Sequence, residues 1–306
     1  DATATLKRLL DEVGRIVVGQ QALLEGLLIG LLAGGHVLVE GVPGLAKTTA
    51  VRTLAQALGL GFRRVQFTPD LLPGDLVGTP VYHPDERRFA VRQGPIFTPV
   101  LLADEINRAP AKVQSALLEA MEERQVTIGD ESFALPQPFF VMATQNPIEH
   151  EGTYPLPEAQ IDRFLLKLVV GYPSAEEEHV IAVRDDADVA HVDAVADAAL
   201  VEAMQRSAAA VHVADAVSDY AVRLVRRTRE ERDVTVGASP RASRFLVRAA
   251  KARALLDGRD FATPFDVKRT APDVLRHRIV LSYEAEADGV RPERIVEAVL
   301  AAVETP

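Results

Sequence analysis

The segment with the clearest chemistry in this chain is a glycine-rich loop between an apolar run and a Lys-Thr pair. It follows the apolar residues 37–40 and reads Gly41, Val42, Pro43, Gly44, Leu45, Ala46, Lys47 and Thr48. Backbone N–H groups of such a loop, with the first turn of the next helix, point at phosphate oxygens. Lys47 would neutralise the β- and γ-phosphates, and the Thr48 hydroxyl would bind Mg²⁺. This segment predicts a nucleotide site that also includes Thr49.

The loop departs from its usual pattern at one position. Ala46 stands directly before Lys47, where a second glycine is usual. Alanine is tolerable there if the residue already has helical dihedral angles. A chance glycine-rich turn before a helix is the competing interpretation, and the strand-loop-helix context disfavours it.

Two carboxylates follow a second apolar run further along the chain. The run at 100–103 leads directly into Asp104 and Glu105. A carboxylate at the end of a parallel strand can hold Mg²⁺ and its nucleotide. Asp104 would bind the metal shell, and Glu105 would act as the base on the attacking water. Acidic pairs are common on ordinary surfaces, so this interpretation depends on the phosphate loop.

Polar residues next to two other apolar runs complete the candidate set in the first half. Asn146 follows the run at 139–144, where its amide would orient the attacking water or sense the γ-phosphate. An Asn-Pro turn with Pro147 is the alternative, and both can hold together. Arg163 precedes the final apolar run and would act as an arginine finger on a neighbour's phosphate. A structural ion pair with Asp162 is the competing interpretation.

A further arginine marks the start of a helix in the second half of the chain. Ser239 is a good N-cap, and Pro240 suits the first helical position. Arg241 then lies in the first turn, where a cation is unfavourable to the helix dipole. This position indicates an anion nearby, and Arg244 is the local competitor for the same role.

Composition limits the function classes. The chain has 306 residues, and 34 lysines and arginines against 44 acidic residues give a net charge of −10, which argues against non-specific binding to nucleic acid. It has no cysteine, and its seven histidines share no metal-ligand spacing. The longest apolar stretch, residues 22–33, is too short to span a bilayer. We therefore expect a soluble, cytoplasmic protein without membrane contact.

The elements that must position these residues can be read from the alternation of patterns. Strand-like runs alternate with helical ones, which predicts a parallel sheet between helices; the runs are 37–40, 64–67, 100–104, 139–144 and 165–170. Hairpins are expected at 79–93 and 126–135. After residue 172 the sequence becomes helical. We expect an α/β domain over residues 1–172 and a helical domain over residues 173–306.

The order of these motifs resembles that of AAA+ ATPases, and the sequence from Gly41 to Phe164 closely resembles the MoxR family. Residues 41–48 match the family's Walker A motif, including the alanine, and residues 102–109 match its Walker B motif. By this resemblance, the remaining assignments are sensor 1 at Asn146, the arginine finger at Arg163, sensor 2 at Arg241, and an adenine-side box at Gly19 and Gln20.

The resemblance implies a P-loop AAA+ sandwich with a parallel sheet and a C-terminal all-α lid. The hairpins would correspond to a helix-2 insert at about 75–97 and a pre-sensor-1 hairpin at about 124–137, elements that face the ring pore in relatives such as magnesium chelatase. It also implies a hexameric ring that uses ATP and Mg²⁺, with Arg163 reaching the next subunit's nucleotide and Arg241 contacting the γ-phosphate from the lid. A partner with a von Willebrand factor A domain and chaperone-like maturation, activation or metal loading of client proteins are further implications.

Three alternatives remain open at this point. A magnesium-chelatase-like motor would share the same inserts. A nucleic-acid-directed ring is disfavoured by the acidic balance and by the acidic turn residues Asp85 and Asp130, although Arg87 and Arg88 lie close by. A scaffold that binds nucleotide without hydrolysis is disfavoured because each catalytic position holds a competent residue.

Overall fold

The computed structural model describes residues 2–85, 87–147, 152–183 and 192–306. At its centre lies a parallel sheet of five strands in the order β2-β5-β8-β1-β9. The strands are β1 (Val37–Glu40), β2 (Phe62–Gln66), β5 (Val100–Asp104), β8 (Phe140–Gln145) and β9 (Leu166–Val169). The chain leaves β1 in the interior of the sheet and returns at the β2 edge. Such a reversal of strand order opens a crevice at the carboxyl ends of the strands.

Successive residues of each strand pack into two different apolar cores. Val37 and Val39 of β1 belong to one core, and Leu38 between them belongs to the other. Leu102 and Leu101 of β5 divide in the same way. The period of two is that of a pleated strand. Burial on both faces explains why the sequence of these strands is apolar throughout.

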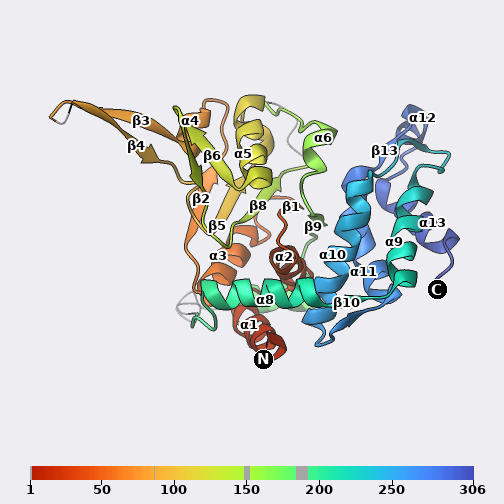
Figure 1. Cartoon of the computed structure of the whole chain (residues 1–306). Coiled ribbons are helices and arrows are strands. Elements are labelled where there is room, and N and C mark those ends of the chain that lie inside the picture. The colour runs from red at the N-terminus through yellow and green to blue at the C-terminus, as the bar shows by residue number, and fades with distance from the viewer. Residues whose placement is uncertain (1, 86, 148–151, 184–191) are drawn as a thin grey trace.

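Helices cover both faces of the sheet (Figure 1). α1 (Ala2–Gly14), α2 (Gln21–Leu32) and α3 (Lys47–Ala57) contribute to the first core. α4 (Pro73–Val77), α5 (Ala111–Glu123) and α6 (Glu158–Ile161) contribute to the second, and the 3₁₀ turn η1 (Ile106–Arg108) leads from β5 towards α5. The sheet is thus held between two helical layers, as the alternation of patterns predicts.

Two antiparallel hairpins interrupt the alternation, as predicted. The first pairs β3 (Gly78–His83) with β4 (Arg88–Gln93), and the second pairs β6 (Gln125–Ile128) with β7 (Glu131–Ala134). The β3–β4 hairpin projects away from the body of the protein (Figure 1). Near its end the rings of Tyr82 and Phe89 lie 5.2 Å apart while remaining 50% and 69% exposed. This hairpin therefore displays an aromatic pair to its surroundings.

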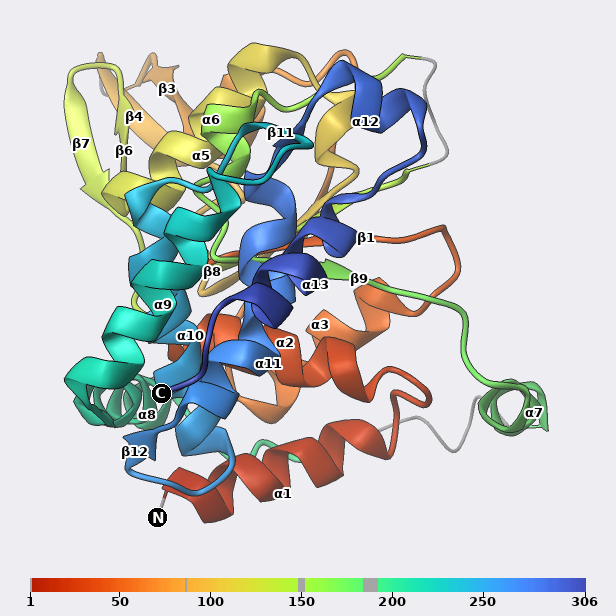
Figure 2. The same cartoon turned by 90° about the vertical axis from the view of Figure 1, so that its right-hand side faces the viewer.

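We refer to the mainly helical chain after β9 as the lid. Its helices are α7 (Ala175–Val183), α8 (Ala198–Ala210), α9 (Asp215–Thr228), α10 (Pro240–Leu256), α11 (Pro264–Leu275), α12 (Tyr283–Ala287) and α13 (Pro292–Ala302), with a 3₁₀ turn η3 (Arg276–Arg278). α10 packs against α8, α9 and α11, and it also contacts α2 of the first core. Figure 2 shows α7 apart from this bundle. The lid and the first face of the sheet consequently share one apolar core.

The lid differs from the predicted all-helical domain in two places. Short strands β10 (His212–Val213) and β12 (Phe261–Ala262) pair in parallel, and β11 (Val234–Val236) and β13 (Val280–Leu281) pair antiparallel. Strands of two or three residues show no detectable alternation, so the sequence did not reveal them. Across the described residues, every helix is too short or too polar to cross a membrane.

Candidate active site

A cavity of about 510 Å³ opens at the carboxyl ends of β1, β5 and β8. It brings together the glycine-rich loop, the acidic pair and Asn146, which are far apart in the sequence. The residues that line it are Pro43, Gly44, Leu45, Ala46, Lys47, Thr48, Thr49, Arg64, Asp104, Glu105, Thr144, Gln145 and Asn146. We call this space the phosphate cavity.

Lys47 is the first residue of α3 and lines the phosphate cavity. Its ammonium group donates a hydrogen bond to the carbonyl of Gly41 at the start of the loop. Burial lowers the pKa of Lys47, and the carboxylates of Asp104, Glu105 and Glu40 act in the opposite direction. The ammonium is therefore held across the loop, where an anionic ligand would replace the carbonyl as its partner.

Ala46 does not have the right-handed helical backbone that would make alanine easy to accommodate. Its φ is 55° and its ψ is 19°, which is the left-handed region. Helix α3 begins at Lys47, so Ala46 lies just before the helix and does not meet that condition. An L-residue in this region brings its Cβ close to the following carbonyl oxygen. Alanine is accommodated here with local strain that glycine would avoid.

The acidic pair is held by a residue that belongs to neither sequence motif. Asp104 ends β5, and Thr144 lies on the neighbouring strand β8. The Thr144 hydroxyl donates to Asp104 Oδ1 at 2.6 Å and accepts from the Glu105 backbone N–H at 2.9 Å. One hydroxyl thus fixes both acidic residues. The only sequence signal for Thr144 is a polar residue near the end of an apolar run.

Strand β2 supplies two more residues that sequence reasoning missed. Arg64 donates to Asp104 Oδ2 from Nη2 at 2.6 Å and from Nε at 2.9 Å. Gln66 donates to Glu105 Oε2 at 2.7 Å, and Arg108 donates to the same oxygen at 3.1 Å. Because β2 pairs with β5 in parallel, with Gln66 opposite Asp104, polar residues late in β2 reach the acidic pair.

The residues present suit a nucleotide with Mg²⁺. Mg²⁺ prefers oxygen ligands and is commonly held by one or two protein groups together with substrate phosphates. The Thr48 hydroxyl and the Asp104 carboxylate line one cavity with Lys47, and these two oxygens are the protein ligands we propose. Bound Mg²⁺ would supply positive charge to the phosphate oxygens. Asn146, only 8% exposed, lines the same cavity.

A second cavity of about 280 Å³ adjoins the loop. It shares Gly44, Leu45, Ala46 and Thr49 with the phosphate cavity, and its other lining residues are Ile16, Val17, Val18, Gln20, Pro173 and Ile181. A space lined mainly by aliphatic side chains beside a phosphate loop suits a purine ring. Pro173 and Ile181 were not predicted, because only folding brings these distant residues to the loop.

Three predicted binding residues support these cavities rather than line them. Gly19 has a positive φ of 73°, and a Cβ added there would lie 3.0 Å from Glu177 Oε2. Val42 packs against the first core. The Gly41 backbone N–H donates to the Gln145 carbonyl at 3.3 Å, which ties the loop to the end of β8. These residues shape the backbone around the site.

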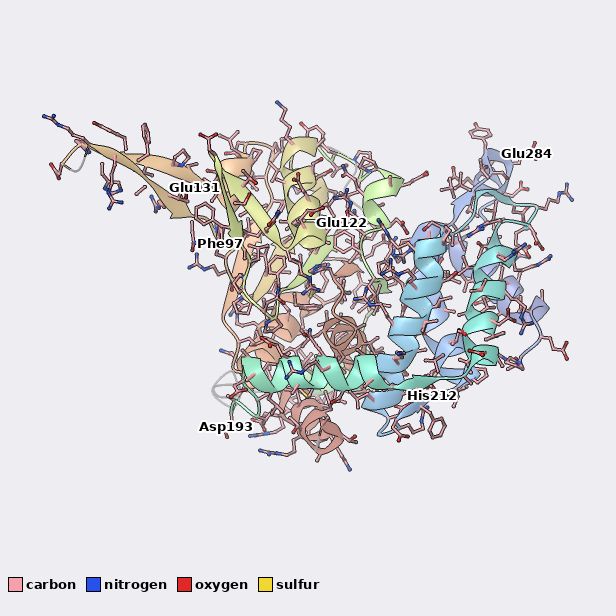
Figure 3. The ribbon with its side chains drawn as sticks, in the orientation of Figure 1. Phe97, Glu122, Glu131, Asp193, His212 and Glu284 are labelled. Atoms are coloured by element: carbon pink, nitrogen blue, oxygen red, sulfur yellow. The ribbon has the colours of Figure 1, made fainter. Side chains whose placement is uncertain are left out.

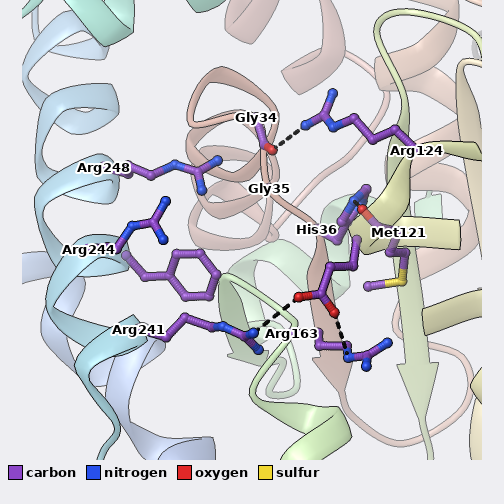
Figure 4. Close-up of a pocket in the computed structure, with 11 residues that line it drawn as sticks. Gly34, Gly35, His36, Met121, Arg124, Arg163, Arg241, Arg244 and Arg248 are labelled. Atoms are coloured by element: carbon purple, nitrogen blue, oxygen red, sulfur yellow. Dashed lines mark hydrogen bonds and ion pairs between the residues drawn. The ribbon is translucent and has the colours of Figure 1, made fainter. Parts of the chain in front are cut away.

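Arg163 and Arg241 lie together at a different cavity, of about 260 Å³ (Figure 4). Glu122, on the side of α5 that faces α10 (Figure 3), bridges them. Its Oε2 is 3.1 Å from Arg163 Nε, and its Oε1 is 3.2 Å from Arg241 Nη2. Arg124, Arg244 and Arg248 also line this space. We call it the arginine cavity.

This placement differs from the expectation that Arg241 and Lys47 approach one nucleotide from the two domains of one chain. The described lining of the phosphate cavity contains neither Arg241 nor Arg163. Arg241 instead pairs with Glu122 and, at 3.5 Å, with Asp162. The two arginines therefore face the same space, which is separate from the phosphate cavity of their own chain.

Comparison with known proteins agrees with this geometry. Residues 36–166 match the family described as "ATPase family associated with various cellular activities (AAA)", and residues 226–299 match the AAA lid domain. Chaperone MoxR1 of Mycobacterium tuberculosis is 52% identical over 99% of this chain and 82% of the relative. Protein MoxR of Methylorubrum extorquens is 34% identical over 100% of this chain and 96% of the relative.

A solved structure gives the same result for the fold. The crystal structure of a candidate ATPase from Cytophaga hutchinsonii superposes with a TM-score of 0.92 at 45% identity, covering 100% of this chain and 96% of that one. Its similarity includes both the sheet and the lid. The motifs, the fold and the relatives agree, and the chain belongs to the MoxR family of AAA+ ATPases, enzymes that hydrolyse ATP.

Proposed function

We propose that this protein works as a homo-oligomeric ring, a hexamer, in which each ATP is bound by one subunit and hydrolysed with help from the next. The position of Arg163 carries this proposal. Its guanidinium lies in the arginine cavity with Arg241, while the phosphate cavity of the same chain is lined by the cations Lys47 and Arg64. A head-to-tail interface would bring the arginine cavity of one subunit to the phosphate cavity of its neighbour.

In this arrangement each residue has a defined role. Lys47 and the loop bind the phosphates, Glu105 accepts a proton from the attacking water, and Asn146 orients that water. Arg163 and Arg241 of the adjacent subunit stabilise charge on the transferring phosphoryl group. Glu122 Oε1 lies 3.2 Å from Arg241 Nη2 and holds Arg241 beside Arg163. In our proposal Arg241 therefore also acts in trans.

Mixed oligomers test this proposal. Glu105→Gln subunits have an inactive phosphate cavity but an intact Arg163. Arg163→Ala subunits have an intact phosphate cavity but lack the arginine. An equal random mixture should regain activity at about a quarter of its junctions, because only that fraction combines two intact halves. Arg241→Ala subunits mixed with Glu105→Gln should behave in the same way. If no ratio restores turnover, neither arginine acts in trans.

We propose that ATP hydrolysis drives the remodelling of client proteins in the cytoplasm, including their activation or maturation by metal loading. The chaperone name of the relative from Mycobacterium tuberculosis supports a client-directed role. The projecting β3–β4 hairpin, with exposed Tyr82 and Phe89, offers a surface for an unfolded apolar segment.

We also propose that the protein works with a partner that carries a von Willebrand factor A domain. The Glu105→Gln variant should retain ATP and so hold its complexes longer than the wild type. Affinity purification of this variant from its native cells should enrich such a partner together with a client. The same purification of Lys47→Ala should enrich neither protein. Recovery of porphyrin-pathway proteins instead would favour a magnesium-chelatase-like motor.

A further inference from the structure

Asp162, the residue before Arg163, receives contacts from three side chains of the lid. Arg278 Nε donates to its Oδ1 at 2.7 Å. The Ser239 hydroxyl donates to Oδ2 at 3.2 Å, and Arg241 Nη1 lies 3.5 Å from the same oxygen. Asp162 belongs to the sheet domain, at the end of α6, so its carboxylate joins the two domains.

Arg278 anchors this contact from inside the protein. Its side chain is only 1% exposed, and its Nη2 also donates to the backbone carbonyls of Asp162, at 2.9 Å, and of Phe164. Burial lowers the pKa of Arg278 to about 10, against the opposite effect of Asp162, so the group stays charged at neutral pH. A buried guanidinium requires a paired carboxylate. The segment from Asp162 to Phe164 is therefore fixed to the lid on both sides of Arg163.

The same carboxylate also fixes Arg241. Arg241 is shared between Asp162 and Glu122, and Glu122 in turn holds Arg163. Arg163 and Arg241 are thus connected twice, through the chain at Asp162 and through the side chain of Glu122. Glu122 is 42% exposed, and pairs of this kind contribute little to stability. Asp162, tied to buried Arg278, is the stronger of the two connections.

We infer that Asp162 is a positioning residue that holds Arg163 and Arg241 in one fixed arrangement, so that both reach the neighbour's γ-phosphate together. This inference rests on the proposed function, in which the two arginines act in trans. Because three of its partners belong to the lid, a movement of the lid redirects both arginines. The nucleotide state of one subunit would in this way affect hydrolysis at the adjacent site.

Asp162→Asn tests the inference, because it removes the charge but keeps an oxygen for Arg278. ATP turnover at saturating ATP should fall about 10- to 100-fold, the effect of misplacing a catalytic group by roughly 1 Å. Affinity for a fluorescent ATP analogue should stay within about twofold, because Asp162 does not line the phosphate cavity. Glu158→Gln, a matched change at an exposed position of the same helix, should leave turnover unchanged.

Mixing experiments separate a positioning role from a general structural one. Asp162→Asn mixed with Glu105→Gln should regain turnover, since the phosphate cavity of the Asp162 variant is intact. Asp162→Glu keeps the charge that Arg278 needs but shifts the carboxylate by one methylene, and it should show the same loss and the same rescue. This second variant decides the question if Asp162→Asn does not fold.

The Arg163→Ala and Glu105→Gln mixture is the reference for both variants. If it regains turnover while the Asp162 variants do not, the inference about Asp162 is wrong and the proposed function stands. If the reference mixture does not regain turnover either, Arg163 does not act in trans, and the proposed function itself is wrong. Wild-type turnover in both Asp162 variants would overturn the inference directly.

Discussion

Arg64 Nη2 lies 2.6 Å from Asp104 Oδ2, the carboxylate that we assign to Mg²⁺. The other oxygen of Asp104 accepts the Thr144 hydroxyl at 2.6 Å. Both oxygens of this metal ligand are therefore engaged, one of them by a cation. The Arg64 side chain is 46% exposed and Asp104 is 13% exposed, so the arginine can turn outwards while the carboxylate stays in place.

This relationship predicts competition between Arg64 and Mg²⁺. Arg64→Gln should lower the Mg²⁺ concentration that gives half-maximal binding of a fluorescent ATP analogue, by about two- to fivefold, the effect of removing a partly exposed ion pair. The half-saturating Mg²⁺ concentration of the ATPase reaction should shift with it. Arg63→Gln, on the same strand, is the control. A higher Mg²⁺ requirement in Arg64→Gln would contradict competition and would indicate that Arg64 assists metal binding.

Glu105→Gln should retain ATP binding and lose hydrolysis. Removing a general base lowers turnover by about 10²- to 10⁴-fold, whereas the loop, Lys47 and Asp104 remain to bind the nucleotide. Turnover and binding of a fluorescent ATP analogue should be measured on the same preparation, with Glu119→Gln on α5 as the carboxylate control. Turnover close to wild type in Glu105→Gln would exclude Glu105 as the base.

Ala46→Gly should stabilise the protein. Glycine adopts the left-handed conformation of residue 46 without the clash of Cβ, and this advantage exceeds its greater entropy loss on folding, for a net gain of about 1 kcal/mol. Urea unfolding of the nucleotide-free protein measures the change. Ala203→Gly, within the right-handed helix α8, should instead destabilise by about 1 kcal/mol. A loss of stability in Ala46→Gly would contradict the strained backbone.

His36 should make the protein less stable in mild acid. It is buried, its Nδ1 accepts the Val141 N–H at 3.0 Å, and Nε2 lies 3.2 Å from the Met121 carbonyl. Burial, with a smaller effect of Arg124, lowers its pKa to about 3. The unfolded chain binds a proton near pH 6.5 and the folded chain does not, so stability falls by about 2 kcal/mol between pH 7.5 and 5.

The substitution His36→Gln isolates this effect. The variant should have a lower free energy of unfolding than the wild type at pH 7.5. This difference in unfolding free energy should be smaller by about 2 kcal/mol at pH 5. Val141→Ala is a matched control, because it loosens the same region and keeps the histidine. The difference in unfolding free energy between Val141→Ala and the wild type should not depend on pH. A pH-independent difference for His36→Gln would show that His36 does not cause the loss of stability in acid.

The sequence was most informative where chemistry follows an apolar strand. Lys47, Asp104 and Asn146 each come shortly after a buried run, and parallel strands bring their carboxyl ends to one edge, so their meeting at the phosphate cavity was predictable. Arg64 and Thr144 reach the same edge by the same geometry. They carry no motif spacing, however, and a single polar residue near a strand end has many ordinary explanations.

Other features depend on tertiary structure alone. Ile181 reaches the loop only because the chain returns after β9, and no local pattern records that approach. The direction of Arg241 depends on Glu122 and Asp162, two carboxylates supplied by the other domain. The left-handed backbone of Ala46 was not predicted, because no sequence pattern specifies the dihedral angles of the residue just before a helix.

The most direct measurement of the central claim is ATP turnover per subunit across a range of protein concentrations with Mg²⁺, for the wild type and Lys47→Ala. If Arg163 completes the site of a neighbour, turnover per subunit should rise with concentration as subunits assemble, and Lys47→Ala should be inactive throughout. Turnover that is independent of concentration in a protein shown to be monomeric would contradict the shared site.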